Sequence, residues 1–339
     1  MSSKRVVYYD LLNISACIAV IALHCNVMVH TWTPGLNWKF ALAIEVMFYW
    51  AVPVFFMLTG ATCMCYRTKY STTVFLKKRF KKTLIPFLFW NSAIYVYMIL
   101  FQGADILGPR AFINLILENK IENIYWFFFP LFSIYLSLPI ISKLQDDMKT
   151  IRYALIASFV FTSLAPFTLP EVGISWAGNT TVFACGSYLS YVLLGYYLAN
   201  NDIKKETRCC IYLLGIFAMA FRYLFTLNSS NSLGYVDRTY FDYTAFPAYL
   251  QAAAVFVLAK YFDPKCLSKF KNVLSKASSC SFGVYLIHKP VLDFLIFQGM
   301  GVSTLSITLR TIGVPILYLS CAFIVYILKK IPVVKIIVP

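Results

Sequence analysis

The stretch YDLLNISACIAVIALHCNVMV at residues 9–29 decides the fold, because it is apolar for almost its whole length. A helix needs about 20 mostly apolar residues to cross about 30 Å of hydrocarbon. This stretch is long enough, and it runs on from Asp10 without the small residues that mark a signal-peptide cleavage site. It therefore predicts a first transmembrane helix that stays in the mature protein.

Nine further stretches have the same character. With the first they predict ten membrane spans, near residues 9–29, 40–64, 84–102, 124–141, 151–169, 182–199, 209–227, 241–260, 277–298 and 304–328. The composition agrees, because 60% of the residues are hydrophobic and only 13% are charged. We expect an all-α polytopic membrane protein, a bundle of about ten transmembrane helices that forms one domain over residues 1–339 and leaves no soluble domain.

The distribution of basic residues predicts how the bundle faces. Most of the 30 Lys and Arg residues lie at the N-terminus, around the loops after even-numbered spans or in the C-terminal tail. Loops rich in Lys and Arg stay inside, so we expect both termini to be cytoplasmic in a multi-pass protein of the plasma membrane. The net charge of +16 then indicates contact with membrane lipids and not with nucleic acid. The exceptions are Lys39, Arg110, Lys120, Arg222, Arg238, Lys289 and Arg310.

The cysteines give no sign of a disulfide framework or a metal site. All ten lie in predicted spans or cytoplasmic loops, whereas disulfides persist in oxidising compartments. Cys63 and Cys65 have no second pair and no histidine near them, as a zinc site would require. We therefore expect no metal.

Ionisable residues inside the bilayer are the first candidates for a functional site, because each costs about 2.5–3.5 kcal/mol to insert. His24 lies about five residues before the outer end of the first span, and Glu45 lies about five residues after the outer start of the second. The similar depth predicts a Glu–His pair, unless His24 only bonds to a backbone carbonyl. Arg222 and Arg310 are interpreted as cavity or packing residues.

Two helical faces carry polar stripes. Asn13 and His24 are eleven residues apart, which places them on one face and about 16 Å apart along the axis. In the ninth span Ser281, Tyr285 and His288 also share one face. Such a stripe lines either a polar cavity or a seam between helices.

Six short motifs follow one another along the chain. They are YYDLLNISACIAVIALH (8–24), VPVFFMLTG (52–60), FLKKRFKKTLIPFLFW (75–90), YWFFFPLFSIYLSLPII (125–141), YLSYVLLGYYL (188–198) and SFGVYLIHKPVL (281–292). In order and spacing they resemble the motifs of the integral-membrane acyltransferase family 3. That family comprises ten-helix enzymes that acylate cell-surface glycans with acyl-CoA.

The resemblance implies a membrane acyltransferase that moves an acyl group from cytosolic acyl-CoA to a hydroxyl of a cell-surface or lipid-linked glycan. It favours acetyl-CoA as donor, with succinyl and longer groups left open, and O-acetylation of a polysaccharide as the outcome. The chain departs from the family pattern at three positions. Asn13 stands where the family usually has Arg, Thr59 replaces a Ser, and Pro53 replaces an acidic residue. We also expect no C-terminal esterase-like domain after the tenth span.

The resemblance also implies roles for single residues. His24 ends the first motif and is the expected general base, or alternatively forms an acyl-histidine. Glu45 would orient its imidazole, as carboxylates do in catalytic triads. Tyr285 and His288 would bind the acceptor or polarise the carbonyl, or else pack helices.

Binding of the acyl-CoA phosphates is expected at a basic run. The stretch 67–82 holds seven basic residues, and Arg79, Lys81 and Lys82 lie in the family-like motif. They suit a multiply anionic ligand. Asn13 falls at the position from which the family's Arg would assist, but its amide cannot neutralise a phosphate. The alternatives are an ordinary positive-inside loop, or docking at the basic stretch 260–276.

A transporter or a flippase for lipid-linked glycans is the rival class, since it also needs many helices and buried charges. Transporters often consist of two repeated halves with broken helices at matched positions. The chain shows no such internal repeat. The acyltransferase interpretation is therefore preferred.

Overall fold

The computed structural model describes residues 5–177, 185–262, 270–298 and 306–339, and these residues form helices without any strand. Eight helical segments among them are long and apolar enough to cross a membrane. The protein is thus an all-α polytopic membrane protein, as predicted. Its α-helices are α1 Val7–His24, α2 Leu36–Phe48, α3 Ala51–Cys63, α4 Thr72–Gln102, α5 Pro109–Leu117, α6 Phe128–Ile141, α7 Met148–Ser158, α8 Ala165–Thr168, α9 Tyr188–Asn200, α10 Lys205–Leu233, α11 Phe246–Tyr261, α12 Lys271–Phe297 and α13 Val314–Leu328.

The two predicted spans outside these eight segments correspond to α9 and α11, which are only 13 and 16 residues long. The first three residues of the span predicted at 182–199 lie outside the described residues. The span predicted at 241–260 starts late, at Phe246. The delay has a local cause, because the Asp242 carboxylate accepts a hydrogen bond of 2.7 Å from the Thr244 amide and holds a turn there.

The span predicted at 40–64 is interrupted. It consists of α2 and α3, which are separated at Tyr49 and Trp50. Pro53 accounts for the interruption, because its ring lacks an N–H and would clash with the carbonyl of Tyr49 in a continuous helix. The interruption leaves Tyr49 and Trp50 outside regular helix, and Tyr49 lines one of the cavities described below.

The basic stretch 67–82 is not the loop that the sequence suggested. Helix α4 begins at Thr72, where the Ser71 hydroxyl accepts a hydrogen bond from the Val74 amide, so most of the stretch is helical. Consecutive residues of a helix point about 100° apart. Lys81 and Lys82 therefore face different directions.

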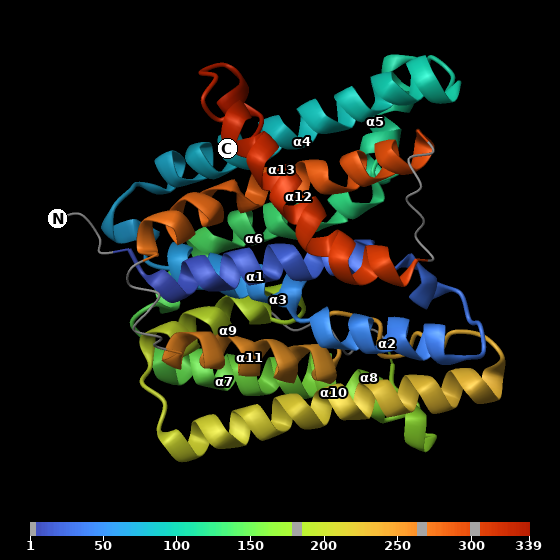
Figure 1. Ribbon diagram of the computed structural model, residues 1–339. Coiled ribbons are helices and arrows are strands. Elements are labelled where there is room, and N and C mark those ends of the chain that lie inside the picture. Colours follow the sequence, from blue (N-terminus) through green and yellow to red (C-terminus); the bar gives the residue numbers. More distant parts are fainter. Residues whose placement is uncertain (1–4, 178–184, 263–269, 299–305) are drawn as a thin grey trace.

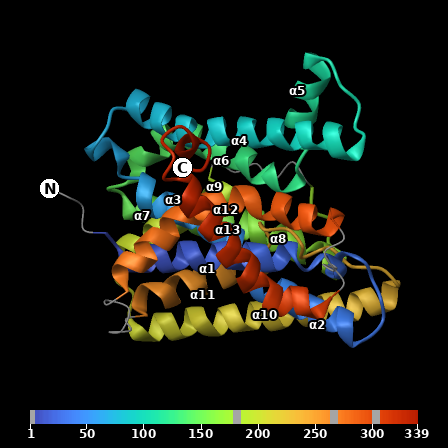
Figure 2. The same cartoon turned by 45° about the horizontal axis from the view of Figure 1, so that its top comes forward.

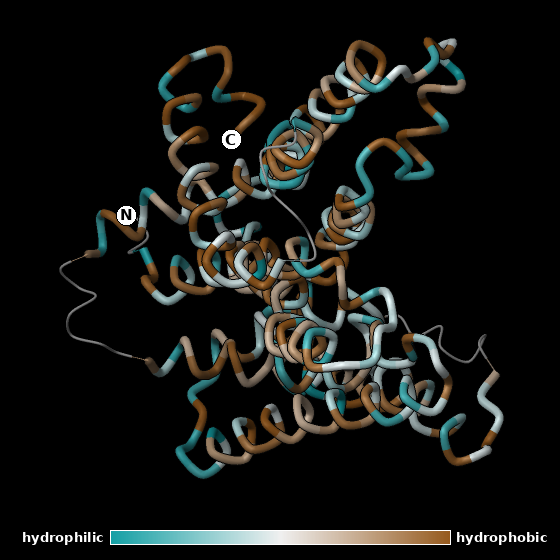
Figure 3. The backbone as a smooth tube through the Cα atoms, turned by 45° about the vertical axis from the view of Figure 1, so that its right-hand side comes forward, coloured by the Kyte–Doolittle hydropathy of each residue, from teal (hydrophilic) through white to brown (hydrophobic). Residues whose placement is uncertain are grey.

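Figures 1 and 2 both place α1 in the middle of the bundle, between α4 on one side and α10 on the other. The segment 36–68 is also central, with 78% of its most apolar window buried, against 17% for α4. Figure 3 shows hydrophobic residues on the outermost helices as well, as expected for surfaces that face lipid. We call the end where α1 begins the basic end and the end where α1 finishes the far end.

Helices α3 and α9 approach each other closely at two glycines. A Cβ atom on Gly60 would overlap the backbone carbonyl of Val192, and one on Gly195 would overlap the backbone of Met57. Small residues permit such close helix contacts in membranes. Both glycines lie in motifs that the sequence singled out. In these motifs the glycines allow α3 and α9 to pack closely.

Enlarging either glycine should destabilise the protein. We expect Gly60→Val and Gly195→Val each to lower the free energy of unfolding by about 3 kcal/mol, the upper end of the range typical of overpacking. The loss is large because backbone atoms cannot move aside as a side chain does. Thermal unfolding in detergent measures the effect. Gly108→Ala is the matched control, since its Cβ would meet no atom within 4 Å and its φ is −66°. Equal stability of all three variants would contradict the close contact.

Candidate active site

Three cavities follow one another along α1. The basic cavity, of 710 Å³, is lined by α1 from its start to Asn13. The neck cavity, of 20 Å³, is lined by Val20, Leu23 and His24, and the far cavity, of 390 Å³, begins at Leu23. Phe55 and Phe127 line both the basic cavity and the neck. Neighbouring cavities therefore share lining residues along α1, and the smallest of the three lies beside His24.

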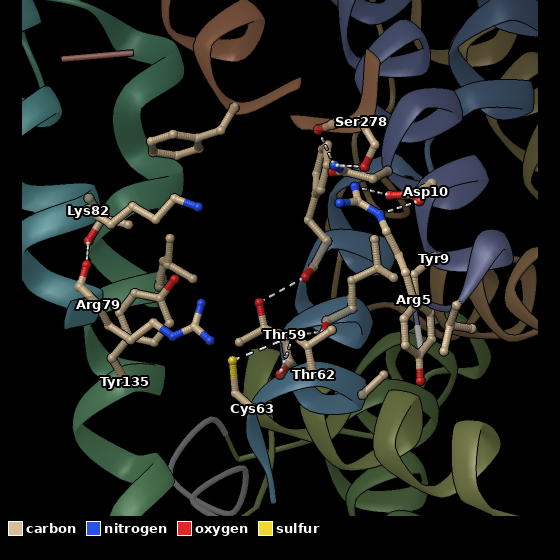
Figure 4. A pocket seen from close by; sticks show the side chains of 18 of the residues that line it. Arg5, Tyr9, Asp10, Thr59, Thr62, Cys63, Arg79, Lys82, Tyr135 and Ser278 are labelled. Atoms are coloured by element: carbon tan, nitrogen blue, oxygen red, sulfur yellow. Dashed lines mark hydrogen bonds and ion pairs between the residues drawn. The ribbon is translucent and has the colours of Figure 1, made fainter. Parts of the chain in front are cut away.

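The basic cavity carries cations without counter-charges. Figure 4 shows Arg79 and Lys82 of α4 on one side, opposite Thr59 and Thr62 of α3. Among the described residues no carboxylate lies within salt-bridge distance of Arg79, Lys82 or the neighbouring Lys69. Unpaired cations around a large cavity suit an anionic ligand such as phosphate.

Of the three basic residues that the sequence predicted to bind phosphate, two line the basic cavity and one does not. Arg79 and Lys82 line the basic cavity, whereas Lys81 does not. The reason is helical phase, since the turn of α4 that directs Arg79 and Lys82 inward directs Lys81 away from them. The structure therefore gives no support to Lys81 as a ligand contact. It adds Lys69, which the sequence placed in the same stretch without singling it out.

Asn13 lines the basic cavity, but the NH2 of its side chain is already hydrogen-bonded within the protein. Its Nδ2 donates to the carbonyl oxygen of Ser278 at 2.9 Å and to the Ser278 hydroxyl at 3.0 Å. Only the amide oxygen is left for a ligand, and an oxygen acceptor does not bind phosphate. The geometry thus assigns Asn13 to the contact between α1 and α12 instead of to phosphate binding.

Arg5 also lines the basic cavity, but its charge is neutralised by a carboxylate of the same chain. Arg5 donates to both carboxylate oxygens of Asp10, at 2.8 and 2.7 Å, and to the carbonyl of Ser275 at 3.1 Å. The hydrogen bond with Asp10 raises the pKa of the Arg5 guanidinium above its ordinary value. Arg5 therefore fastens the start of α1 to α12.

The two polar stripes predicted from the sequence face each other. Asn13, Cys17 and His24 of α1 contact Ser278, Ser281 and His288 of α12, with sequence separations of 265, 264 and 264. The nearly constant separation shows that α1 and α12 run parallel and in register. The stripe on α1 is consequently both a helix seam and the wall of a cavity.

His24 pairs with His288. Its Nδ1 lies 2.7 Å from Nε2 of His288, and the two ring planes are within 14° of each other with centroids 5.0 Å apart, so the rings meet edge to edge. Nδ1 of His288 lies 3.1 Å from the carbonyl oxygen of Val284, which can only accept a hydrogen bond. Neutral His288 therefore carries its proton on Nδ1 and accepts at Nε2, so His24 donates from Nδ1.

This arrangement has a chemical consequence. A neutral His24 that carries its proton on Nδ1 has a free lone pair on Nε2, which is the atom that a general base uses. His24 lines both the neck and the far cavity. His288 is fully buried, and both of its ring nitrogens are engaged, so it has no atom free for a direct contact with an acceptor.

Glu45 lines the far cavity with His24, but the predicted pair between them is absent from the hydrogen bonds of the described residues. Among the described residues Glu45 forms no ion pair within salt-bridge distance with Arg222 either. Arg222 is 1% exposed and its guanidinium lies 3.6 Å from the ring centroid of Tyr49 and 4.8 Å from that of Phe241. It thus supports two aromatic walls of the far cavity.

Two tyrosines stand beside the neck. The Tyr285 hydroxyl donates to the carbonyl of Ile124, which leaves no phenolic proton for a substrate. Tyr243 lines both the neck and the far cavity, and its ring is stacked on those of Tyr49 and Trp126. Among the described residues nothing hydrogen-bonds to the Tyr243 hydroxyl. Tyr243 is therefore held in place with a free donor.

The sequence analysis missed two features of this site. It treated His24 and His288 separately, although their positions near the outer ends of two parallel spans were a usable signal. It placed Tyr243 inside a span, and nothing in the local pattern marks that residue. Arg310, interpreted as a cavity or packing residue, hydrogen-bonds to the carbonyls of Ser306 at 3.3 Å and Asn37 at 3.4 Å, away from the three cavities.

Comparison with known proteins gives one result. The model of acyltransferase family 3, described as an acyltransferase domain, matches residues 6–330, which is nearly the whole chain. Neither the curated proteins nor the solved structures contain a match. Because the family model covers most of its length, the chain belongs to this family of acyltransferases, and it is a membrane acyltransferase.

Proposed function

We propose that this protein transfers an acetyl group from acetyl-CoA, bound in the basic cavity, to a hydroxyl of a cell-surface or lipid-linked glycan in the far cavity. The observation that carries the proposal is the position of His24 beside the smallest of three cavities along α1, with no hydrogen bond to its Nε2 among the described residues. The basic end would face the cytosol, where acyl-CoA is available, and the far end would face outward.

The charge and the position of the basic cavity support binding of the donor there. Lys69, Arg79 and Lys82 would hold the phosphates of coenzyme A at the cytosolic mouth. The pantetheine arm would extend between α1 and α3 toward Phe55 and Phe127, where the basic cavity meets the neck. The thioester then lies beside His24.

The transfer needs no atom from outside the two substrates. The acceptor hydroxyl oxygen attacks the thioester carbonyl carbon, and its proton passes to Nε2 of His24. The new C–O bond forms, the C–S bond breaks, and the coenzyme A thiolate leaves. The thiolate takes the proton back from the imidazolium, so His24 is regenerated.

Two further residues support this step. The Tyr243 hydroxyl would donate to the carbonyl oxygen, which becomes negative when the hydroxyl attacks. The Glu45 carboxylate would stabilise the imidazolium from across the far cavity, a role that requires no direct hydrogen bond. Neither a cofactor nor a metal enters the scheme.

Transfer of label tests the function directly. Purified protein in lipid nanodiscs would receive acetyl-CoA labelled in the acetyl group, with an envelope glycan fraction from cells that lack the gene. Labelled glycan and free coenzyme A are the expected products. Movement of glycan across the bilayer of proteoliposomes, which separate an inside from an outside, without covalent change would instead indicate a flippase.

His288 should act as a positioning residue for His24. We expect His288→Gln to retain turnover within about 10–100-fold of the wild type, because its amide oxygen can still accept from Nδ1 of His24. His288→Leu should lose more, because no acceptor then fixes the tautomer. The kcat of both variants in the label assay is the measurement, and the KM for acetyl-CoA should stay constant. Equal loss in both variants would show that the hydrogen bond is irrelevant.

A further inference from the structure

The neck cavity is the smallest of the three, and it lies where the reacting atoms must meet. It shares Phe55 and Phe127 with the basic cavity, and it shares Leu23, His24 and Tyr243 with the far cavity. A thioester carbonyl within reach of His24 therefore places its own acyl substituent in the neck. The space available there decides which acyl groups fit.

We propose that the neck cavity is the acyl pocket and that Val52 of α3 and Val20 of α1 restrict the donor to acetyl. The inference rests on the proposed function and adds to it the residues that select the acyl group. The neck has a volume of 20 Å³, and about 10–15 Å³ is needed for one water-sized group. A methyl group fits this space, whereas a propyl tail does not.

The chemistry of the walls agrees with the size. Most of the wall is apolar, with Val20, Val52, Phe55, Ile124, Trp126 and Phe127. Among the described residues around the neck there is no Lys or Arg to pair with a carboxylate. A succinyl group would leave its charge unpaired there, at a high cost in free energy. The neck therefore discriminates against charged acyl groups as well as long ones.

Packing behind the walls keeps the neck small. The Phe127 ring is stacked on Phe56 with centroids 4.8 Å apart, and its centroid lies 5.6 Å from that of Tyr285. The Trp126 ring is stacked on Tyr243 at 5.6 Å. Val52 is only 7% exposed. Close-packed side chains of this kind do not move aside for an extra methylene without strain.

A longer acyl group finds no unoccupied space in the far cavity either. An acyl tail that left the neck toward the far end would enter the 390 Å³ that the acceptor occupies. A longer donor should then compete with the acceptor. Chain-length selection would appear in the transfer step even where the coenzyme A part of the donor still binds.

A series of donors tests the pocket. Purified protein in nanodiscs would receive acetyl-, propionyl-, butyryl- and succinyl-CoA with the envelope glycan fraction, and release of coenzyme A thiol would be followed. In the wild type each added methylene should lower kcat/KM by about 10–200-fold, the range for a methylene that a pocket excludes. Val52→Ala should raise the propionyl-to-acetyl ratio at least about tenfold, and Val20→Leu should depress even acetyl transfer.

Val54→Ala is the matched control, because Val54 is a fully buried valine of α3 that lines none of the three cavities. It should lose stability without changing the ratio of propionyl to acetyl transfer. Equal ratios in Val52→Ala and Val54→Ala, or transfer of butyryl as fast as acetyl by the wild type, would overturn the acyl pocket alone. Absence of transfer from every donor would overturn the proposed function itself.

Discussion

His24→Gln is expected to lower acyl transfer by about 10²–10⁴-fold, which is the usual contribution of a positioned general base. Glutamine keeps an amide that can donate to Nε2 of His288, so the contact between α1 and α12 survives. It cannot accept a proton near neutral pH, so the chemical step is lost. The kcat of transfer from labelled acetyl-CoA is the measurement.

Donor binding provides the control for this variant. Equilibrium dialysis with labelled coenzyme A should give the same affinity for His24→Gln as for the wild type, because His24 does not line the basic cavity. Loss of binding would mean that the substitution disturbs the fold. Near-normal transfer by His24→Gln would refute the general-base mechanism, and a requirement for His288 alone would move the chemistry to α12.

Arg79→Gln combined with Lys82→Gln is expected to raise the KM for acetyl-CoA by about 10²-fold or more. Each charge-assisted hydrogen bond contributes about 1.5–3 kcal/mol, and two such contacts are removed. The kcat should change much less, because the phosphates are held equally in the ground state and in the transition state. Initial rates over a range of acetyl-CoA concentrations separate the two constants.

Lys81→Gln is the matched control for charge. It removes a cation from the same turn of α4, but Lys81 does not line the basic cavity. Its KM for acetyl-CoA should stay within about twofold of the wild type at an ionic strength of about 0.15 M, where the Debye length is about 8 Å. A screened charge acts only weakly beyond that distance. A KM that rises as much in Lys81→Gln as in the double variant would replace the specific cavity with a general attraction of the basic end for anions.

Several properties of the protein could be read from the sequence. Long apolar runs predict membrane spans because the bilayer leaves a chain no other way to satisfy its backbone. The face of His24 on α1 followed from the period of a helix, which requires only residue numbers. Its place along the helix did not, because α1 ends at His24 instead of continuing for about five more residues. The order of the six motifs indicated the family, and the family match over residues 6–330 confirms it.

Errors in the sequence-based prediction arose where a local contact overrides hydrophobicity. Pro53 divides the second span, and the Asp242 turn delays α11. The first turns of α4 continue the helix into a stretch whose charges suggested a loop. Each of these features depends on one hydrogen bond or one missing N–H, and an average over a window of apolar residues does not register such detail.

Only the tertiary structure decided which side chains meet. Residue numbers give the phase of a side chain on its own helix, but they do not say which helices are neighbours. The sequence indicated Glu45 as the partner of His24, whereas the parallel packing of α1 on α12 brings His288 to it. The same limit applies to the cavities, because their walls come from helices far apart in the chain. Packing between helices creates that space, and no single helix encodes it.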